Sequence, residues 1–110
     1  MPEIKNYAIR VHGGPSGSGE AIRAQIHLFD DRNKMVGAMD FYDEGVALPA
    51  DRKEDMIRMA LPASQIHTVV DILRNEGPVY LVWQERLQNA YLGTSQEPVG
   101  EGERMMGGGN

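Results

Sequence analysis

The spacing of apolar residues changes once along this chain, and this change limits the fold more than any other feature. Apolar and polar residues alternate over residues 5–12, 21–29 and 35–43, which is typical of strands with one buried face. Over residues 62–76 the apolar residues instead recur every three or four positions, as in an amphipathic helix. Pro78 then prevents that helix from continuing. The chain therefore combines several strands with one helix.

Three shorter segments are also typical of strands: residues 55–61 before the helix, and residues 78–84 and 88–94 after it. We expect the first three strands to form an antiparallel meander. The whole order predicts an α+β fold, a curved antiparallel sheet of about six strands with the helix over one face. The side of the sheet beneath the helix is predicted to carry Ile22, Ile26, Met35, Met39, Phe41 and Met59.

The length of 110 residues leaves room for one domain with one core. We predict that residues 1–94 form this domain and that residues 95–110, which lack an apolar period, form a flexible tail. The chain contains no cysteine, which fits a reducing compartment. No apolar run approaches the roughly 20 residues that span a bilayer, and the first residues lack the character of a signal peptide. We therefore expect a cytoplasmic protein that does not contact membranes.

The stretch HGGPSGSGE, residues 12–20, is the one segment that superficially resembles a ligand-binding loop. A dinucleotide or phosphate loop must lead into a helix, whereas the residues that follow here alternate as a strand. The nucleophile motif G-x-S-x-G also fails, because Ser18 stands where its last glycine should be. We interpret the stretch as a flexible connection between two strands.

The sequence offers no recognisable catalytic or metal-binding pattern. The three histidines, His12, His27 and His67, do not have the spacing of metal ligands. Most carboxylates fall in predicted turns, where they are far more often solvated charges than acid–base pairs. We therefore predict a non-enzymatic protein without a metal or a cofactor.

The face of the sheet turned away from the helix has the most unusual composition in the chain. Although the net charge is −5, strand alternation gathers arginine, histidine and tyrosine on this face, with Asp40 as its acid. Arginines bind phosphates and stack, and tyrosines stack on bases, so such a face suits single-stranded nucleic acid. The predicted nucleic-acid-binding residues are Arg10, His12, Arg23, Gln25, His27, Tyr42 and Arg58.

The run of four strands and one helix over about residues 5–76 resembles the repeat of the Pur-alpha-like single-stranded nucleic acid binding proteins. The resemblance lies in the order of the elements and not in a sequence motif. It implies that two such units join into a complete domain, and that Arg10, Arg23 and Arg58 lie on a sheet that binds nucleic acid. In this chain two more strands follow the helix, where that family begins a second repeat or ends.

Two functions from different classes follow from this interpretation. The first is a small binding domain, expected to be a homodimer, whose polar sheet face contacts single-stranded DNA or RNA. The alternative is a protein-interaction or assembly module that uses the same face, or a methionine-rich edge, to contact a protein partner. A small-ligand-binding barrel or an enzyme is the third possibility, and it has the least support because no nucleophile–base pair is visible.

Overall fold

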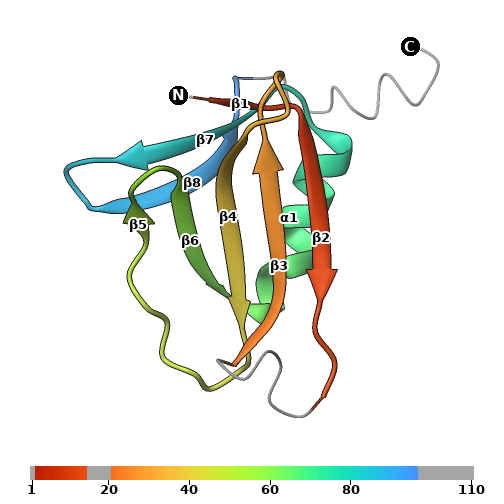
Figure 1. Cartoon of the computed structure of the whole chain (residues 1–110), viewed down its shortest axis with the longest axis vertical. Coiled ribbons are helices and arrows are strands. Elements are labelled where there is room, and N and C mark those ends of the chain that lie inside the picture. The colour runs from red at the N-terminus through yellow and green to blue at the C-terminus, as the bar shows by residue number, and fades with distance from the viewer. Residues whose placement is uncertain (1, 15–20, 97–110) are drawn as a thin grey trace.

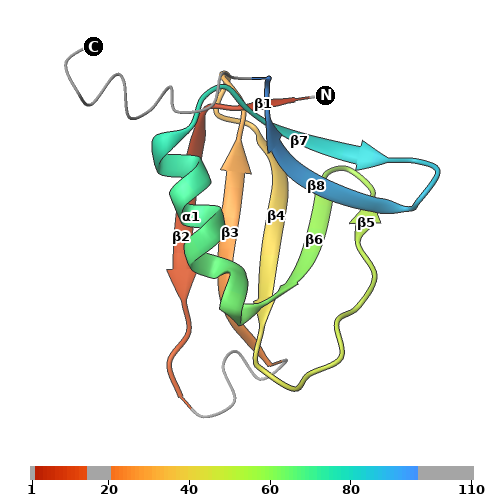
Figure 2. The same ribbon diagram turned by 180° about the vertical axis from the view of Figure 1, so that it is seen from behind.

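The computed structural model describes residues 2–14 and 21–96. Within these residues eight strands form two sheets around one helical segment, and Figures 1 and 2 show the two sides of the molecule. The larger sheet has the strand order β2-β3-β4-β6-β5, and the smaller has the order β1-β7-β8. The elements are β1 (Glu3–Ile4), β2 (Asn6–Val11), β3 (Ile22–Phe29), β4 (Met35–Tyr42), β5 (Arg52–Lys53), β6 (Ile57–Pro62), η1 (Ala63–Gln65), α1 (Ile66–Asn75), β7 (Val79–Gln84) and β8 (Asn89–Thr94).

The predicted α+β class is confirmed, and so is the antiparallel meander of β2, β3 and β4. The fourth strand of the large sheet differs from the expectation, because β6 pairs with β4 in parallel. Figure 1 shows the reason: the connection over residues 43–56 climbs along the edge of the sheet before β6 descends beside β4. A connection of this length allows a parallel neighbour, which a tight hairpin cannot provide.

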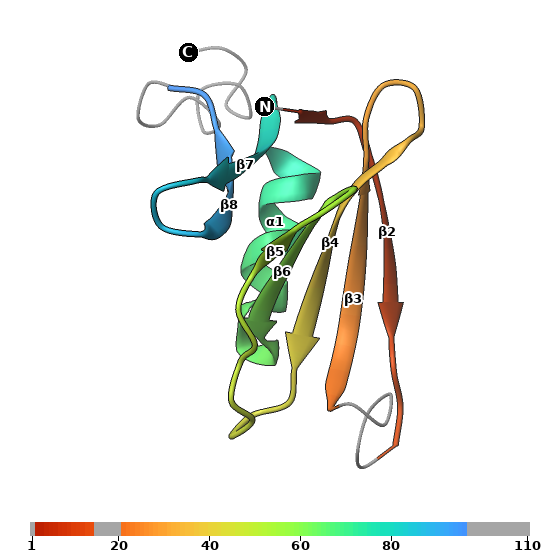
Figure 3. The same ribbon diagram turned by 60° about the vertical axis from the view of Figure 1, so that its left-hand side comes forward.

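The strands after the helix also differ from the expectation, because they do not extend the large sheet. The β7–β8 hairpin pairs with β1 in a separate sheet and stands behind the large one, on the same side as α1 (Figures 2 and 3). Leu81 of β7 packs so closely over Gly37 of β4 that a Cβ atom at position 37 would collide with its side chain. The missing side chain of Gly37 therefore lets the two sheets approach each other.

The predicted helix is confirmed: a 3₁₀ turn over Ala63–Gln65 leads into α1, Ile66–Asn75. Figure 2 shows that α1 covers the large sheet. Val69 of α1 is buried, and Val70 and Leu73 pack partly buried against the core. The largest fully buried side chains belong mostly to the large sheet, and they are Phe41, Ile26, Leu28, Met39 and Leu81. Among the described residues, no helix has the length and apolar character needed to cross a membrane.

The register between β3 and β4 shifts at two places, and only one of these shifts changes which side chains face the core. Between β3 and β4 the register shifts after Leu28, so that Phe29 lies opposite Met35. As a result Val36 packs against the core, whereas Met35, predicted beneath the helix, lines an open groove. The second shift lies between Ile22 and Ala24 and affects Arg23.

Two sequence predictions concern residues outside the described part of the chain. Residues 15–20, the centre of the glycine-rich connection, lie outside it. So does nearly all of the predicted tail, because the described residues end at Gln96.

Candidate binding surface

The candidate surface is the side of the five-stranded sheet opposite α1, which we call the front face. No helix or strand of the described chain covers it, as Figure 1 shows. Strand register arranges its side chains in two rows that run across the sheet. The upper row runs from β3 to β5 and ends at the outer strand, and its members in order are His27, Ala38, Arg58 and Arg52. The lower row begins at the opposite outer strand, and its members in order are Arg10, Gln25, Asp40 and Ala60.

Asp40 lies at the centre of the front face and is only 3% exposed. Nη1 of Arg58 donates to both carboxylate oxygens of Asp40, at 2.7 and 2.9 Å, and Nε2 of Gln25 donates at 3.0 Å. A buried carboxylate requires such partners, because an unpaired charge out of water costs several kcal/mol. Of the predicted binding residues, Arg58 and Gln25 thus hold a buried charge as well as facing solvent.

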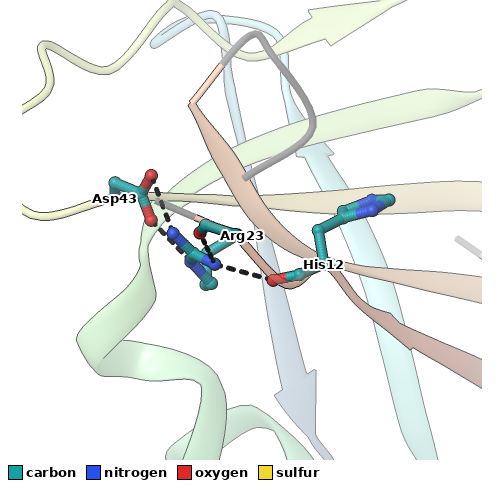
Figure 4. A network of polar contacts seen from close by, with 4 residues as sticks. His12, Arg23 and Asp43 are labelled. Atoms are coloured by element: carbon teal, nitrogen blue, oxygen red, sulfur yellow. Dashed lines mark hydrogen bonds and ion pairs between the residues drawn. The ribbon is translucent and has the colours of Figure 1, made fainter. Parts of the chain in front are cut away.

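Arg23 lies on the polar side of β3, as alternation predicted, because Ile22 and Ala24 on either side of it are buried. The register between β3 and β4 shifts at this point, so that Ile22 lies opposite Tyr42 and Ala24 opposite Phe41, and Arg23 has no directly opposite residue in β4. Its guanidinium instead binds groups at the ends of the strands, as Figure 4 shows. It donates to the Asp43 carboxylate at 2.8 and 3.4 Å, and to the main-chain carbonyls of His12 at 2.7 Å and Gly14 at 2.9 Å. Arg23 therefore fastens the end of β2 to the end of β4.

The two histidines predicted on this surface, His12 and His27, lie in different surroundings. His12 points its imidazole away from Arg23 (Figure 4), and its Nε2 is buried without a hydrogen-bond partner among the described residues. His27 is half-buried and lies directly between Ala8 and Ala38 in the sheet. In the described part of the chain, histidine and carboxylate side chains nowhere gather in groups of three that could hold a metal ion.

Arg52 belongs to the front face although sequence reasoning did not select it. It lies directly opposite Arg58, in β5, a strand of only two residues. The preceding Asp51 fixes the backbone at this point, because its carboxylate accepts the main-chain N–H of Ala60 at 2.9 Å and of Ala90 at 3.0 Å. A two-residue strand is too short to show alternation, so no pattern could have identified it.

A hollow of about 450 Å³ has Arg52 and Arg58 in its lining, together with Met59 and Ala60 of β6. Tyr42 and Asp40 line it from the sheet, and the connection lines it through Pro49 and Ala50. It therefore brings two guanidinium groups and one phenol ring to the edge of the same depression. A second hollow, of about 460 Å³, lies on the other side of β6 and has Trp83, Met35 and Met56 in its wall.

Comparisons of this chain with protein-family models, with curated proteins and with solved structures found no match. The resemblance to the Pur-alpha-like proteins therefore stays a prediction from the order of the elements.

Proposed function

We propose that the front face binds single-stranded DNA or RNA and that the domain is a binding module without catalytic activity. The observation that carries this proposal is the distribution of charge. The chain has a net charge of −5, yet the two rows of the front face contain Arg10, Arg52 and Arg58 against one acid, Asp40. A protein that is acidic overall but basic on an open sheet face is suited to a local contact with phosphates.

The three arginines differ in how much they can offer to a ligand. Arg10 and Arg52 are exposed on the two outer strands, β2 and β5. Four inter-strand spacings of about 4.8 Å separate these strands, so the arginines span about 19 Å of the sheet. Arg58 lies between them with 28% of its side chain exposed and its Nη1 held by Asp40. We expect Arg10 and Arg52 to provide the main phosphate contacts, and Arg58 to stack or to make a weaker contact.

The hollow lined by Tyr42 offers a place where a base of the nucleic acid can bind. Stacking of a base on an aromatic ring contributes about 1–3 kcal/mol and tolerates any base. Tyr42 lines the same hollow as Arg52 and Arg58, so a base that stacks on its ring would bring the neighbouring phosphate toward the two guanidinium groups. This arrangement favours binding of single strands with little sequence preference.

Arg23 has a reduced role in this proposal. Its guanidinium already makes hydrogen bonds to Asp43 and to two main-chain carbonyls. Donors used in this way are not offered to a phosphate without breaking these bonds. We therefore assign Arg23 to the fold and not to the binding surface.

The test compares two double variants that change the net charge equally. Arg10→Gln with Arg52→Gln removes the cations at both ends of the front face, whereas Arg74→Gln with Arg86→Gln removes exposed cations from α1 and the β7–β8 turn. Binding of a fluorescent 20-nucleotide oligothymidine is measured by anisotropy between about 50 and 300 mM salt. We expect the front-face variant to lose affinity and to flatten the log–log salt dependence by about 1.4, or 0.7 for each lost contact.

The control variant is expected to keep the affinity and the salt slope of the parent. Both variants should keep the parent melting temperature, because all four arginines are exposed. If the parent does not bind the oligonucleotide at about 50 mM salt, the proposal is wrong. Equal losses in the two variants would also overturn it, because they would indicate a general effect of charge.

A further inference from the structure

The two edges of the large sheet are protected to very different degrees. The edge at β5 is a strand of two residues, Arg52–Lys53, and short charged strands resist pairing with another chain. The edge at β2, Asn6–Val11, is six residues long and pairs with β3 without a bulge. It contains no proline and no lysine, so it lacks the usual devices against pairing.

The free side of β2 combines main-chain groups with apolar side chains. The N–H of His12 donates to the carbonyl of Arg23 at 2.8 Å, which shows that His12 directs its main-chain groups toward β3. Antiparallel pairs alternate, so Tyr7, Ile9 and Val11 direct their N–H and C=O groups to the open edge. Two of these side chains are also exposed, Ile9 to 44% and Val11 to 67%.

We propose that two copies of this chain pair antiparallel along β2, around a two-fold axis at Ile9. In this register Ile9 lies opposite Ile9 of the second copy, and Tyr7 lies opposite its Val11. The main-chain groups of all three residues then find partners, and the exposed apolar side chains cover one another. The β2 strand is therefore complementary to β2 of a second copy.

Charge and side-chain size exclude the two registers whose axes lie beyond Ile9 toward the end of β2. With the axis at Ile9, Arg10 lies opposite the small, uncharged Ala8 of the second copy. An axis at Arg10 would set the two arginines directly opposite each other, and like charges in that position destabilise a sheet. An axis at Val11 would leave Ile9 opposite Gly13, which has no side chain to cover it.

This pairing would also extend the front face. The two-fold axis of an antiparallel pair is perpendicular to the sheet, so both front faces lie on the same side of one ten-stranded sheet. The two Arg10 side chains then come to the centre of a surface twice as wide. The pairing depends on β2 alone, and only its consequence for nucleic acid depends on the proposed function.

The first test measures the mass in solution by sedimentation equilibrium up to about 1 mM protein. Two paired strands of six residues form a small interface, so we expect the dimer to have a dissociation constant on the order of 10 μM. Ile9→Lys sets two ammonium groups opposite each other and should leave a monomer of 12.2 kDa. Leu87→Lys is the control, because Leu87 is 61% exposed on the β7–β8 turn. A monomeric parent, or a dimeric Ile9→Lys variant with the parent melting temperature, would overturn the proposal.

The second test addresses the register and avoids a charge in the interface. The chain has no cysteine, so single-cysteine variants report only on the introduced position. Residues in a hydrogen-bonded antiparallel pair have Cα atoms about 5.5 Å apart, within the range of a disulfide. Mild oxidation should therefore link Ile9→Cys to itself rapidly, and link Val11→Cys and Leu87→Cys slowly. If Val11→Cys links as fast as Ile9→Cys, or if neither exceeds Leu87→Cys, the register is wrong.

The same samples separate this inference from the proposed function. A parent that dimerises but ignores the oligonucleotide would keep the pairing and contradict the binding function. A parent that binds the oligonucleotide as a monomer would do the reverse. If both hold, Ile9→Lys should bind with lower affinity than the parent, because one copy offers half of the surface.

Discussion

The back and front faces of the large sheet bury their residues by different means. On the back face, Ile26 and Phe41 are fully buried beneath α1 and the β7–β8 hairpin. On the front face, Asp40 is 3% exposed although no helix or strand among the described residues covers it, because Gln25 and Arg58 from the neighbouring strands close over its carboxylate. The back face is therefore buried by another layer, whereas Asp40 on the front face is buried by side chains of its own sheet.

This difference determines what each face tolerates. Apolar packing is not directional, so a back-face residue can be replaced by another of similar size and shape at a small cost. A hydrogen-bonded ion pair is directional, so loss of one partner leaves a buried charge behind. We expect the ion pair of Asp40 and Arg58 to be sensitive to the loss of one partner and more tolerant of the replacement of both.

The largest effect is expected on the back face, at Val69 of α1. Val69 is 5% exposed, so Val69→Asp would bury a carboxylate without a partner under the helix. This costs several kcal/mol against a total stability of about 5–15 kcal/mol, and should unfold most of the protein. Circular dichroism during urea unfolding measures the loss. Thr68→Asp is the control, because the preceding residue is exposed on the same helix. Equal stability of the two variants would show that α1 does not cover this face.

An intermediate effect is expected at the ion pair of the front face. Arg58→Met leaves Asp40 with Gln25 as its remaining hydrogen-bonding side chain among those described. Breaking a fully buried pair costs about 3–5 kcal/mol, and the partial exposure of Arg58 reduces this to about 2 kcal/mol. Adding Asp40→Leu removes the stranded charge, so the double variant should be more stable than Arg58→Met alone. Urea unfolding of the parent, both single variants and the double variant measures the coupling. A double variant whose loss equals the sum of the single losses would show that the pair is not coupled.

The sequence contained enough information for the regular parts of both faces. The apolar period of α1 could be predicted because Ile66, Val69, Val70 and Leu73 repeat at helical spacing. The alternation of β3 correctly placed Ala24, Ile26 and Leu28 on the buried side. In both segments the side of a residue depends only on its neighbours in the chain, which is the information that a sequence carries directly.

The parts that could not be predicted depend on contacts between distant residues. The bulge at Arg23 arises from pairing with β4, and its partner Asp43 lies 20 residues away. The extra residue leaves the sides of the β3 side chains unchanged, because Ile22, Ala24 and Ile26 are all buried, so the alternation of β3 alone does not reveal it. The parallel pairing of β6 and the position of Arg52 likewise depend on the path of the connection over residues 43–56.

The smallest effect on stability is expected at Asp30, in the turn between β3 and β4. This turn belongs to neither face, so its effect can be compared with those of both faces. The pKa of its carboxyl lies below the ordinary value, first because the main-chain N–H of Lys34 donates to it, and also because that of Arg32 does. A lowered pKa in the folded state stabilises the protein above the ordinary pKa of about 3.9. This contribution is lost as the pH falls through the folded value. Asp30→Asn should therefore melt at a slightly lower temperature than the parent at pH 7, and the difference should shrink by pH 2.

The control for this measurement is Asp31→Asn, which removes the same charge from the neighbouring position of the turn. Thermal melting of the parent and both variants is followed in steps from pH 7 to pH 2. The difference between Asp30→Asn and the parent should stay below the effects at Val69 and Arg58 throughout, because an exposed turn buries no charge and no apolar surface. If the difference instead persists unchanged at pH 2, the ionised carboxylate does not stabilise the turn. In that case the asparagine amide does not accept the two main-chain hydrogen bonds as well as the carboxylate does. The turn would then depend on directional hydrogen bonds, as the Asp40 pair of the front face does.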